Sequence, residues 1–224
     1  MARRLSLAAA LALALSSAQA PAQTAPGAAE IAAYRGLHAA AAAGDGAEIR
    51  RLVTARAELD ARDGNGRTPL HVATFRGHAE AARLLIAAGA QPGLLDDQRY
   101  DAVTIASVRD DEPMLKALIA SGASAALVTS RYDGTALIAA AHLGHDGVVR
   151  ELIRAGAPLD HVNNLGWTAL MEAVVLGDGG PRHVETVRAL VTAGADRRIA
   201  DRQGVTPLQH AKARGYGAIA ALLE

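Results

Sequence analysis

The apolar pattern of residues 66–90 predicts two short helices that pack against each other. Thr68 stands where a helix N-cap is expected, and Pro69 follows at the first helical position, where its missing N–H costs nothing. Gly77 can end the first helix and Gly89 the second, since glycine readily adopts the left-handed conformation that closes helices. Such a pair cannot bury its apolar face alone, so it needs neighbouring copies.

The same pattern recurs along the chain at intervals of 33, 33, 34, 33 and 38 residues. An interval in this range is typical of a solenoid of stacked units. The repeat origins are Arg35, Thr68, Asp101, Thr135, Thr168 and Thr206. Alanine stands five residues after every origin, where a small side chain lets successive first helices approach closely. These alanines are Ala40, Ala73, Ala106, Ala140, Ala173 and Ala211.

The repeats resemble those of the ankyrin family, whose first helix begins with a Thr-Pro-Leu-His signature. Residues 68–71 match this signature fully. Partial matches that keep its threonine and leucine begin at Thr135, Thr168 and Thr206. The third repeat departs most, because Asp101 opens it and Asp110 replaces the helix-ending glycine. The resemblance implies an all-α ankyrin-repeat solenoid over residues 30–224, with β-hairpin-like connecting loops and six repeats that include N- and C-terminal caps.

The first 20 residues have the pattern of an export signal. Arg3 and Arg4 precede an apolar run that is too short for a membrane-spanning helix, and an Ala-x-Ala cleavage pattern ends at Ala20. We expect cleavage after Ala20 and export to the periplasm, with secretion as the alternative. The general secretory route fits better than the twin-arginine route, although the paired arginines leave both open. Residues 21–29 are rich in Pro and Ala and predict a disordered linker.

The amino-acid composition excludes several kinds of partner and of chemical site. Lys plus Arg equals Asp plus Glu at 23 each, so the chain has no basic field for nucleic acid or an anionic membrane. Half of the residues are hydrophobic but only 3% are aromatic, so we expect a core of Ala and Leu. The absence of cysteine excludes disulfides, thiolate zinc sites and cysteine nucleophiles.

The histidines are the first residues to consider for chemistry. His38 and His71 occupy the histidine position of the signature, where we expect the ring to brace the loop between repeats. His78 and His145 follow helix-ending glycines and are interpreted as turn residues. His142 differs, since its place in the repeat predicts that it faces the concave side. No ligand at clear spacing accompanies it in the sequence, so contact with a partner is a better interpretation than metal binding.

The fifth repeat carries an insertion of about five residues within positions 177–183. Its glycines predict a flexible turn between two helices, in which Gly179→Ala should change stability little. Asp178, His183 and Glu185 could form a metal cluster, but a mobile glycine loop is a poor scaffold for one. Because no nucleophile elbow, phosphate loop or His-Glu-x-x-His helix occurs, we expect no enzyme, metal or cofactor.

Binding to another protein is the function that remains. In the ankyrin family, hairpin tips and first-helix residues on the concave face make the binding surface. The corresponding tip positions are Arg67, Tyr100 and Trp167, with Tyr132 close by. The corresponding first-helix positions are Phe75, Arg76, Val108, Arg109, His142, Leu143, Val175, Leu176 and Arg214. An apolar centre flanked by arginine suits a partner with an apolar patch and an acidic rim.

We therefore expect a monomeric, non-catalytic protein that binds a partner protein without nucleic acid, and without a membrane once the signal is removed. Two alternatives stay open. One is a hydrolase-like or metal-dependent enzyme that uses His142 or residues 178–185, and the other is a self-associating structural protein. The identity of the partner is not encoded in the repeat pattern.

Overall fold

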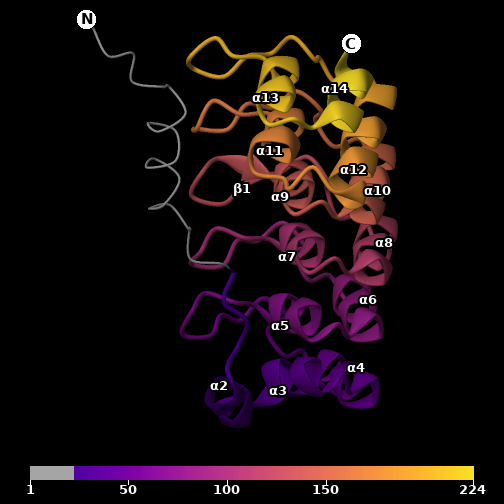
Figure 1. Ribbon diagram of the computed structural model, residues 1–224. Helices are drawn as coiled ribbons and strands as arrows, with labels where there is room; N and C mark the ends of the chain where they lie inside the picture. The colour runs from indigo at the N-terminus through magenta and orange to yellow at the C-terminus, as the bar shows by residue number, and fades with distance from the viewer. Residues whose placement is uncertain (1–22) are drawn as a thin grey trace, which may run out of the picture.

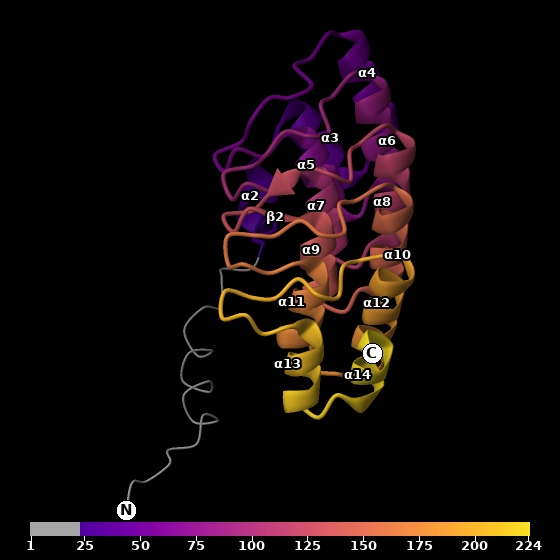
Figure 2. The same ribbon diagram turned by 90° about the horizontal axis from the view of Figure 1, so that it is seen from above.

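The computed structural model describes residues 23–224, and the predicted export signal lies outside these residues. The described chain is an elongated stack of helix pairs with two rows of helices and a column of loops on one side (Figure 1 and Figure 2). The row of first helices contains α3 (Gly36–Ala43), α5 (Pro69–Arg76), α7 (Ala102–Val108), α9 (Ala136–His142), α11 (Ala169–Val175) and α13 (Pro207–Ala213). The row of second helices contains α4 (Gly46–Thr54), α6 (Ala79–Ala87), α8 (Glu112–Ala120), α10 (Asp146–Arg154), α12 (Pro181–Thr192) and α14 (Gly217–Leu223).

Side-chain caps set the beginning of most first helices. Thr68, Asp101, Thr135, Thr168 and Thr206 each accept the main-chain N–H three residues further on, as N-caps do. The predicted register of the repeats is therefore correct. Asp110, which replaces the helix-ending glycine, still adopts the left-handed conformation with φ +56°. The third pair thus has the same backbone geometry at this position as the first, second, fourth and sixth pairs, although its residue is not glycine.

The core lies between successive helix pairs. All six alanines of the repeat column are at most 4% exposed, which confirms that first helices approach closely along this line. Large apolar side chains of both rows fill the remaining space, among them Leu70, Leu85, Leu137, Leu152 and Leu190, each at most 1% exposed. The predicted core of Ala and Leu is confirmed.

The loops between helix pairs are β-hairpin-like, as expected. The third, between α8 and α9, contains two short antiparallel strands, β1 (Val128–Thr129) and β2 (Gly134–Thr135), with Val128 opposite Thr135. Each loop turns around a polar side chain that accepts main-chain N–H groups two and four residues later. These turn residues are Asp63, Asp96, Ser130, Asn163 and Asp201.

Two parts of the chain differ from the sequence prediction. Helix α2 (Ala28–Ala33) begins inside the segment predicted as a linker. Before this helix, the main-chain oxygen of Thr24 accepts the Arg67 guanidinium at 2.7 Å, so disorder was a wrong prediction for this part of the segment. The insertion in the fifth repeat is also not all turn, because α12 has 12 residues where the other second helices have 7 or 9.

Histidines join neighbouring pairs. The Nε2 atoms of His38 and His71 lie 2.9 and 3.0 Å from the main-chain oxygens of Arg67 and Tyr100, which confirms that they brace the next loop. His78 reaches in the other direction, since its Nε2 lies 3.1 Å from the main-chain oxygen of Ala42. His145 likewise contacts the main-chain oxygen of Ser107 at 2.9 Å, and His183 that of His142 at 3.0 Å. The second-helix histidines are therefore contacts between pairs and more than turn residues. Within residues 23–224, no helix has the length and apolar character of a membrane span.

Candidate partner-binding surface

The structure sorts the predicted binding residues by exposure. Those exposed to solvent are Arg76, Arg109, His142 and Leu143. Those half-buried are Tyr100, Val108, Tyr132, Trp167, Leu176 and Arg214. Arg67, Phe75 and Val175 are buried at 3%, 4% and 7% exposure, so the prediction that they present a surface is wrong in this conformation. The binding role of the remaining positions stays a prediction. We call the surface made by the loop tips and the exposed ends of the first helices the hairpin face.

The N-terminal segment explains why two of these residues are buried. The guanidinium of Arg67 donates to Glu30 Oε1 at 3.0 Å as well as to Thr24, and it lies over the ring of Phe75 at 5.6 Å. The amide of Gln98 faces the same segment, because its Oε1 accepts the Thr24 N–H at 3.1 Å. Residues 24–30 therefore occupy the hairpin face beside the second and third helix pairs.

A buried carboxylate lies on the hairpin face further along the stack. The side chain of Glu172, in α11, is 6% exposed, and its Oε2 lies 3.3 Å from Nδ1 of His142, in α9. Its Oε1 accepts the amide of Asn163 at 2.9 Å. Asn163 in turn holds its loop through the N–H groups of Leu165 and Trp167. One helix end, one loop and the next first helix are joined at this point.

Sequence reasoning missed Glu172, although a signal existed. It stands four residues after the origin Thr168, where four other repeats have apolar residues. The equivalent residues are Ala39, Val72, Ile105, Ala139 and His210. A carboxylate in such a column indicates a special contact. The partner His142 comes from the preceding repeat, and no spacing rule within one repeat connects the two residues.

Exposed apolar side chains gather in the same part of the chain. The large hydrophobic residues with substantial exposure in the described structure are Val128, Leu143, Val162 and Leu165, at 42%, 41%, 46% and 40%. Leu143 directly follows His142, while Val162 precedes Asn163 and Leu165 comes two residues after it. Three of the four therefore adjoin the residues that contact Glu172. Exposed apolar clusters of this kind mark interaction sites.

The loop that carries Val162 and Leu165 is fixed to both of its neighbouring loops. Asn164 donates its main-chain N–H to the oxygen of Tyr132 at 2.9 Å and its side-chain amide to the oxygen of Arg131 at 3.0 Å. On the other side, Arg202 donates to the main-chain oxygen of Asn164. Three successive loops are thus tied together before any ligand binds, and such preorganisation lowers the cost of binding.

The glycine-rich insertion is ordered through contacts with neighbouring elements. His183 Nδ1 lies 2.8 Å from Asp178 Oδ1, and the same oxygen accepts the Gly180 N–H at 2.8 Å. The hydrogen bond from Gly180, followed by that with His183, holds the pKa of Asp178 below its usual range. Glu185 binds Arg188 instead, and no group of three potential metal ligands occurs among residues 23–224. Asp178 and His183 therefore serve the loop, and the three residues do not form the cluster considered from the sequence.

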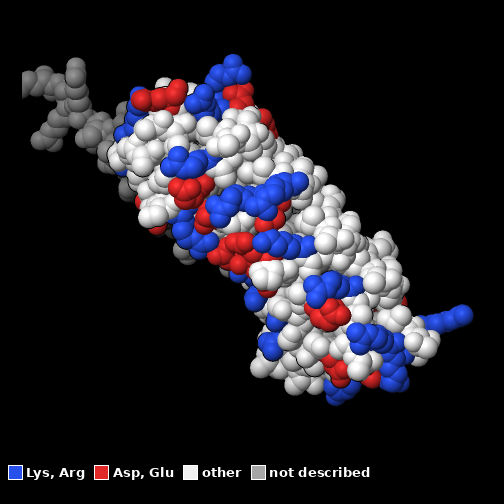
Figure 3. Space-filling view, turned by 90° about the vertical axis from the view of Figure 1, so that its right-hand side faces the viewer, with Lys and Arg blue, Asp and Glu red and all other residues white. Residues whose placement is uncertain are grey.

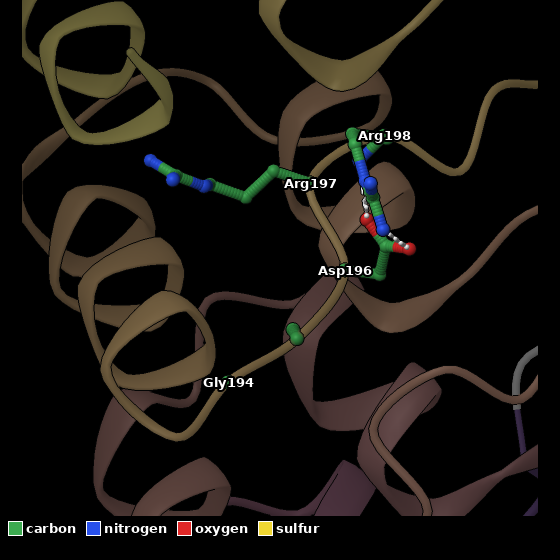
Figure 4. A pocket seen from close by; sticks show the side chains of 5 residues that line it. Gly194, Asp196, Arg197 and Arg198 are labelled. Atoms are coloured by element: carbon green, nitrogen blue, oxygen red, sulfur yellow. Dashed lines mark hydrogen bonds and ion pairs between the residues drawn. The ribbon is translucent and has the colours of Figure 1, made fainter.

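Two other surfaces have different character. On the face of the second helices, acidic and basic side chains are interspersed (Figure 3) and form ion pairs such as Arg83 with Glu80 and Lys116 with Glu151. A hollow of about 430 Å³ lies after α12 and is lined by residues 194–198. Arg198 folds back onto Asp196 at 3.0 Å there, while the side chain of Arg197 extends away from that pair (Figure 4). In the described chain, neither surface has exposed large apolar side chains next to a buried carboxylate that lacks a Lys or Arg partner, as the hairpin face has at Glu172.

Comparison with known proteins agrees with this architecture. The family model described as ankyrin repeats in three copies matches residues 37–129 and 103–201. The putative ankyrin repeat protein YahD of Escherichia coli K12 is 39% identical over 95 residues, which are 42% of this chain and 47% of YahD. The chain therefore matches about half the length of this curated relative.

Solved structures cover more of the chain. An ankyrin repeat domain from Acinetobacter baumannii AYE is 44% identical with a TM-score of 0.79, over 84% of this chain and 95% of the other. The ankyrin repeat protein EF0377 is 31% identical with a TM-score of 0.78, over 85% and 98% of the two chains. Since the family model and the stacked fold cover most of the sequence, the chain belongs to the ankyrin-repeat family.

Proposed function

We propose that this protein is exported to the periplasm, where it binds another protein non-covalently through its hairpin face. Ankyrin repeats are protein–protein interaction modules, which gives the general class. The observation that carries the proposal is the exposure of Val162 and Leu165 on a loop that is tied to both neighbouring loops, with Leu143 exposed at the end of α9. The partner would be held, inhibited or stabilised by this contact.

The exposed residues of the hairpin face support a partner surface that has both an acidic part and an apolar part. Arg76 and Arg109 are exposed at the ends of α5 and α7 and take part in no ion pair of the described residues. They suit an acidic part of the partner, whereas the exposed apolar residues of the fourth and fifth pairs suit its apolar part. The N-terminal segment reduces the available surface, because it contacts Arg67, whose guanidinium lies over Phe75.

Crosslinking in intact cells tests the proposal directly. A photoreactive residue replaces Leu165 in one strain and Ala120, exposed on the second-helix row, in another. We expect one dominant crosslinked protein in the exported fraction from position 165 and none from position 120. Equal crosslinking at both positions, or none at position 165 in a folded and exported protein, would contradict the proposal. N-terminal sequencing of the exported protein should begin at Pro21.

An enzyme is the second candidate, because His142 beside buried Glu172 has the arrangement of a base oriented by a carboxylate. In the described residues, however, no hydroxyl group is hydrogen-bonded to His142. Hydrolysis of a panel of nitrophenyl esters and phosphates by the purified protein separates the two functions. Activity that survives purification and disappears in His142→Ala would favour the enzyme, and no activity above a heat-inactivated sample favours binding.

A further inference from the structure

The pairing of Glu172 is incomplete for a carboxylate at its depth. Three carboxylate residues are buried in the described structure, namely Asp96, Asp101 and Glu172. Asp96 accepts the main-chain N–H groups of its loop, and Asp101 accepts one at the start of its helix. Among residues 23–224, Glu172 accepts no main-chain N–H and is held only by two side chains. It therefore caps no helix and contacts its loop only through the amide of Asn163.

The two side chains that hold Glu172 do not supply a permanent positive charge. The amide of Asn163 is neutral, and His142 is charged only when protonated. No Lys or Arg of residues 23–224 forms an ion pair with Glu172, although several carboxylates with greater exposure have such a partner. Removing a carboxylate from water without a cation carries a large free-energy cost. A cation brought by a partner would reduce that cost.

The next helix pair shows what the same positions do when their role is structural. There Asp201 stands in the loop and His210 in the first helix, with His210 Nε2 2.7 Å from Asp201 Oδ2. That carboxylate also accepts the N–H groups of Gln203 and Val205. In the fifth pair Asn163 accepts the main-chain N–H groups of the loop, at the position of Asp201. The carboxylate of this pair is instead Glu172 in the helix, and it does not accept these N–H groups. The negative charge of Glu172 is therefore not needed to hold the loop, because Asn163 already does so.

We propose that Glu172 is the recognition point for a basic side chain of the partner, and that this side chain, best an arginine, is flanked by apolar residues. The proposal rests on the proposed binding function and adds the chemistry of the partner. The charge of Glu172 fits the basic group, and Leu143, Val162 and Leu165 adjoin its contacts and fit the flanking residues. The guanidinium of arginine suits a carboxylate because it donates two parallel hydrogen bonds.

This assignment predicts the orientation of the partner segment along the stack of helix pairs. Its basic residue lies at the fifth helix pair, whereas the exposed Arg76 and Arg109 lie toward the second and third pairs. A segment with its acidic end over these arginines and its basic end at Glu172 places every charge beside an opposite one. A reversed segment would bring like charges together, which disfavours binding in that orientation.

Selection from a displayed library of random 12-residue peptides tests the proposal with the full exported chain. We expect peptides selected on the wild type to carry Arg or Lys between apolar residues. A synthetic selected peptide should bind Glu172→Gln about tenfold or more weakly. It should bind Glu185→Gln, a change on the second-helix row, as it binds the wild type. Glu172→Gln keeps the side-chain shape and can still accept the Asn163 amide, and circular dichroism verifies its fold.

A second comparison separates a direct contact from a general loosening of the site. Replacing the basic residue of the peptide by glutamine should weaken binding to the wild type but change little for Glu172→Gln. Equal losses on both proteins, or selected peptides without a basic residue, would overturn the assignment. Peptides that depend on Leu165 but ignore Glu172 would do the same while leaving the binding function intact. A library that yields no binder, together with no crosslink from position 165, would overturn both.

Discussion

The ring of Tyr216 occupies the space that a side chain at Gly179 would need. A Cβ atom on Gly179 would come within 2.5 Å of Cδ1 of that ring, and the Tyr216 hydroxyl donates to the main-chain oxygen of Gly177 at 3.0 Å. The glycine-rich insertion of the fifth pair is therefore held by the sixth pair. The sequence-based interpretation of a flexible turn that tolerates substitution is wrong at this position.

We expect Gly179→Ala to lower the free energy of unfolding by about 1–3 kcal/mol, the usual range for overpacking. Backbone strain contributes as well, because Gly179 has a φ of +72°. Gly204→Ala is the matched control, since Gly204 has a φ of +75° but no heavy atom within 4 Å of the added Cβ. Urea unfolding measures both variants. Equal losses would show that strain alone acts and that the contact with Tyr216 contributes nothing.

The fold could be predicted because each repeat states the same pattern independently. The caps, the alanine column and the leucine core all depend on contacts at fixed spacing, so Thr68 and Ala140 could be placed from sequence. The candidate site depends on contacts between different repeats, such as that of His142 with Glu172. The burial of Arg67 depends on residues 24–30, whose composition favours disorder until Arg67 and Gln98 bind them. Patterns within one repeat contain neither relationship.

Ala140→Leu tests the packing between helix pairs. Ala140 is 0% exposed, in the column where first helices approach most closely. Three additional carbon atoms there should cost about 1–3 kcal/mol of stability through overpacking. Ala47→Leu, at an exposed position of α4, should change stability by less than about 0.5 kcal/mol. Similar effects of the two substitutions in thermal unfolding would contradict the assigned register.

The buried ring of His71 makes stability depend on pH. Burial lowers the pKa of His71 below its ordinary value of 6.5. The neutral ring also fits its contacts, because Nδ1 accepts the Thr68 N–H at 3.1 Å and Nε2–H donates to the Tyr100 oxygen. As pH falls below about 6.5, the unfolded chain takes up a proton before the folded chain does. Stability is therefore retained above this pH and lost as pH falls toward the lower pKa of the folded state.

His71→Asn should remove this contribution, which amounts to at most about 1.4 kcal/mol per pH unit for one proton. Unfolding free energies measured in urea between pH 7.5 and 5 should therefore fall less steeply for His71→Asn than for the wild type. His161→Asn retains His71 and should retain its contribution to the slope. An unchanged slope in His71→Asn would show that another group causes the pH dependence.

The N-terminal segment should be fastened to the repeats through Glu30. Its carboxylate accepts Arg67 at 3.0 Å and the Asn65 amide at 2.6 Å, and the Arg67 side chain is only 4% exposed. Glu30→Gln removes one of two carboxylates beside a buried cation, because Asp63 Oδ2 also lies 3.7 Å from the Arg67 guanidinium. We expect a loss of about 1 kcal/mol, discounted for the partial exposure of Glu30. Hydrogen exchange should become faster in residues 24–31 and 65–67, while the C-terminal helix pairs remain protected.

Glu80→Gln provides the control, because Glu80 forms a shorter ion pair with Arg83, at 2.7 Å, but both side chains are more than half exposed. A pair in water contributes little, so this variant should keep both the stability and the exchange pattern of the wild type. If Glu30→Gln behaves like Glu80→Gln, the segment is not held by Arg67. Faster exchange confined to Glu30→Gln would mean that release of residues 24–30 uncovers Arg67 and Phe75. The hairpin face would then extend from the fourth and fifth helix pairs to the second.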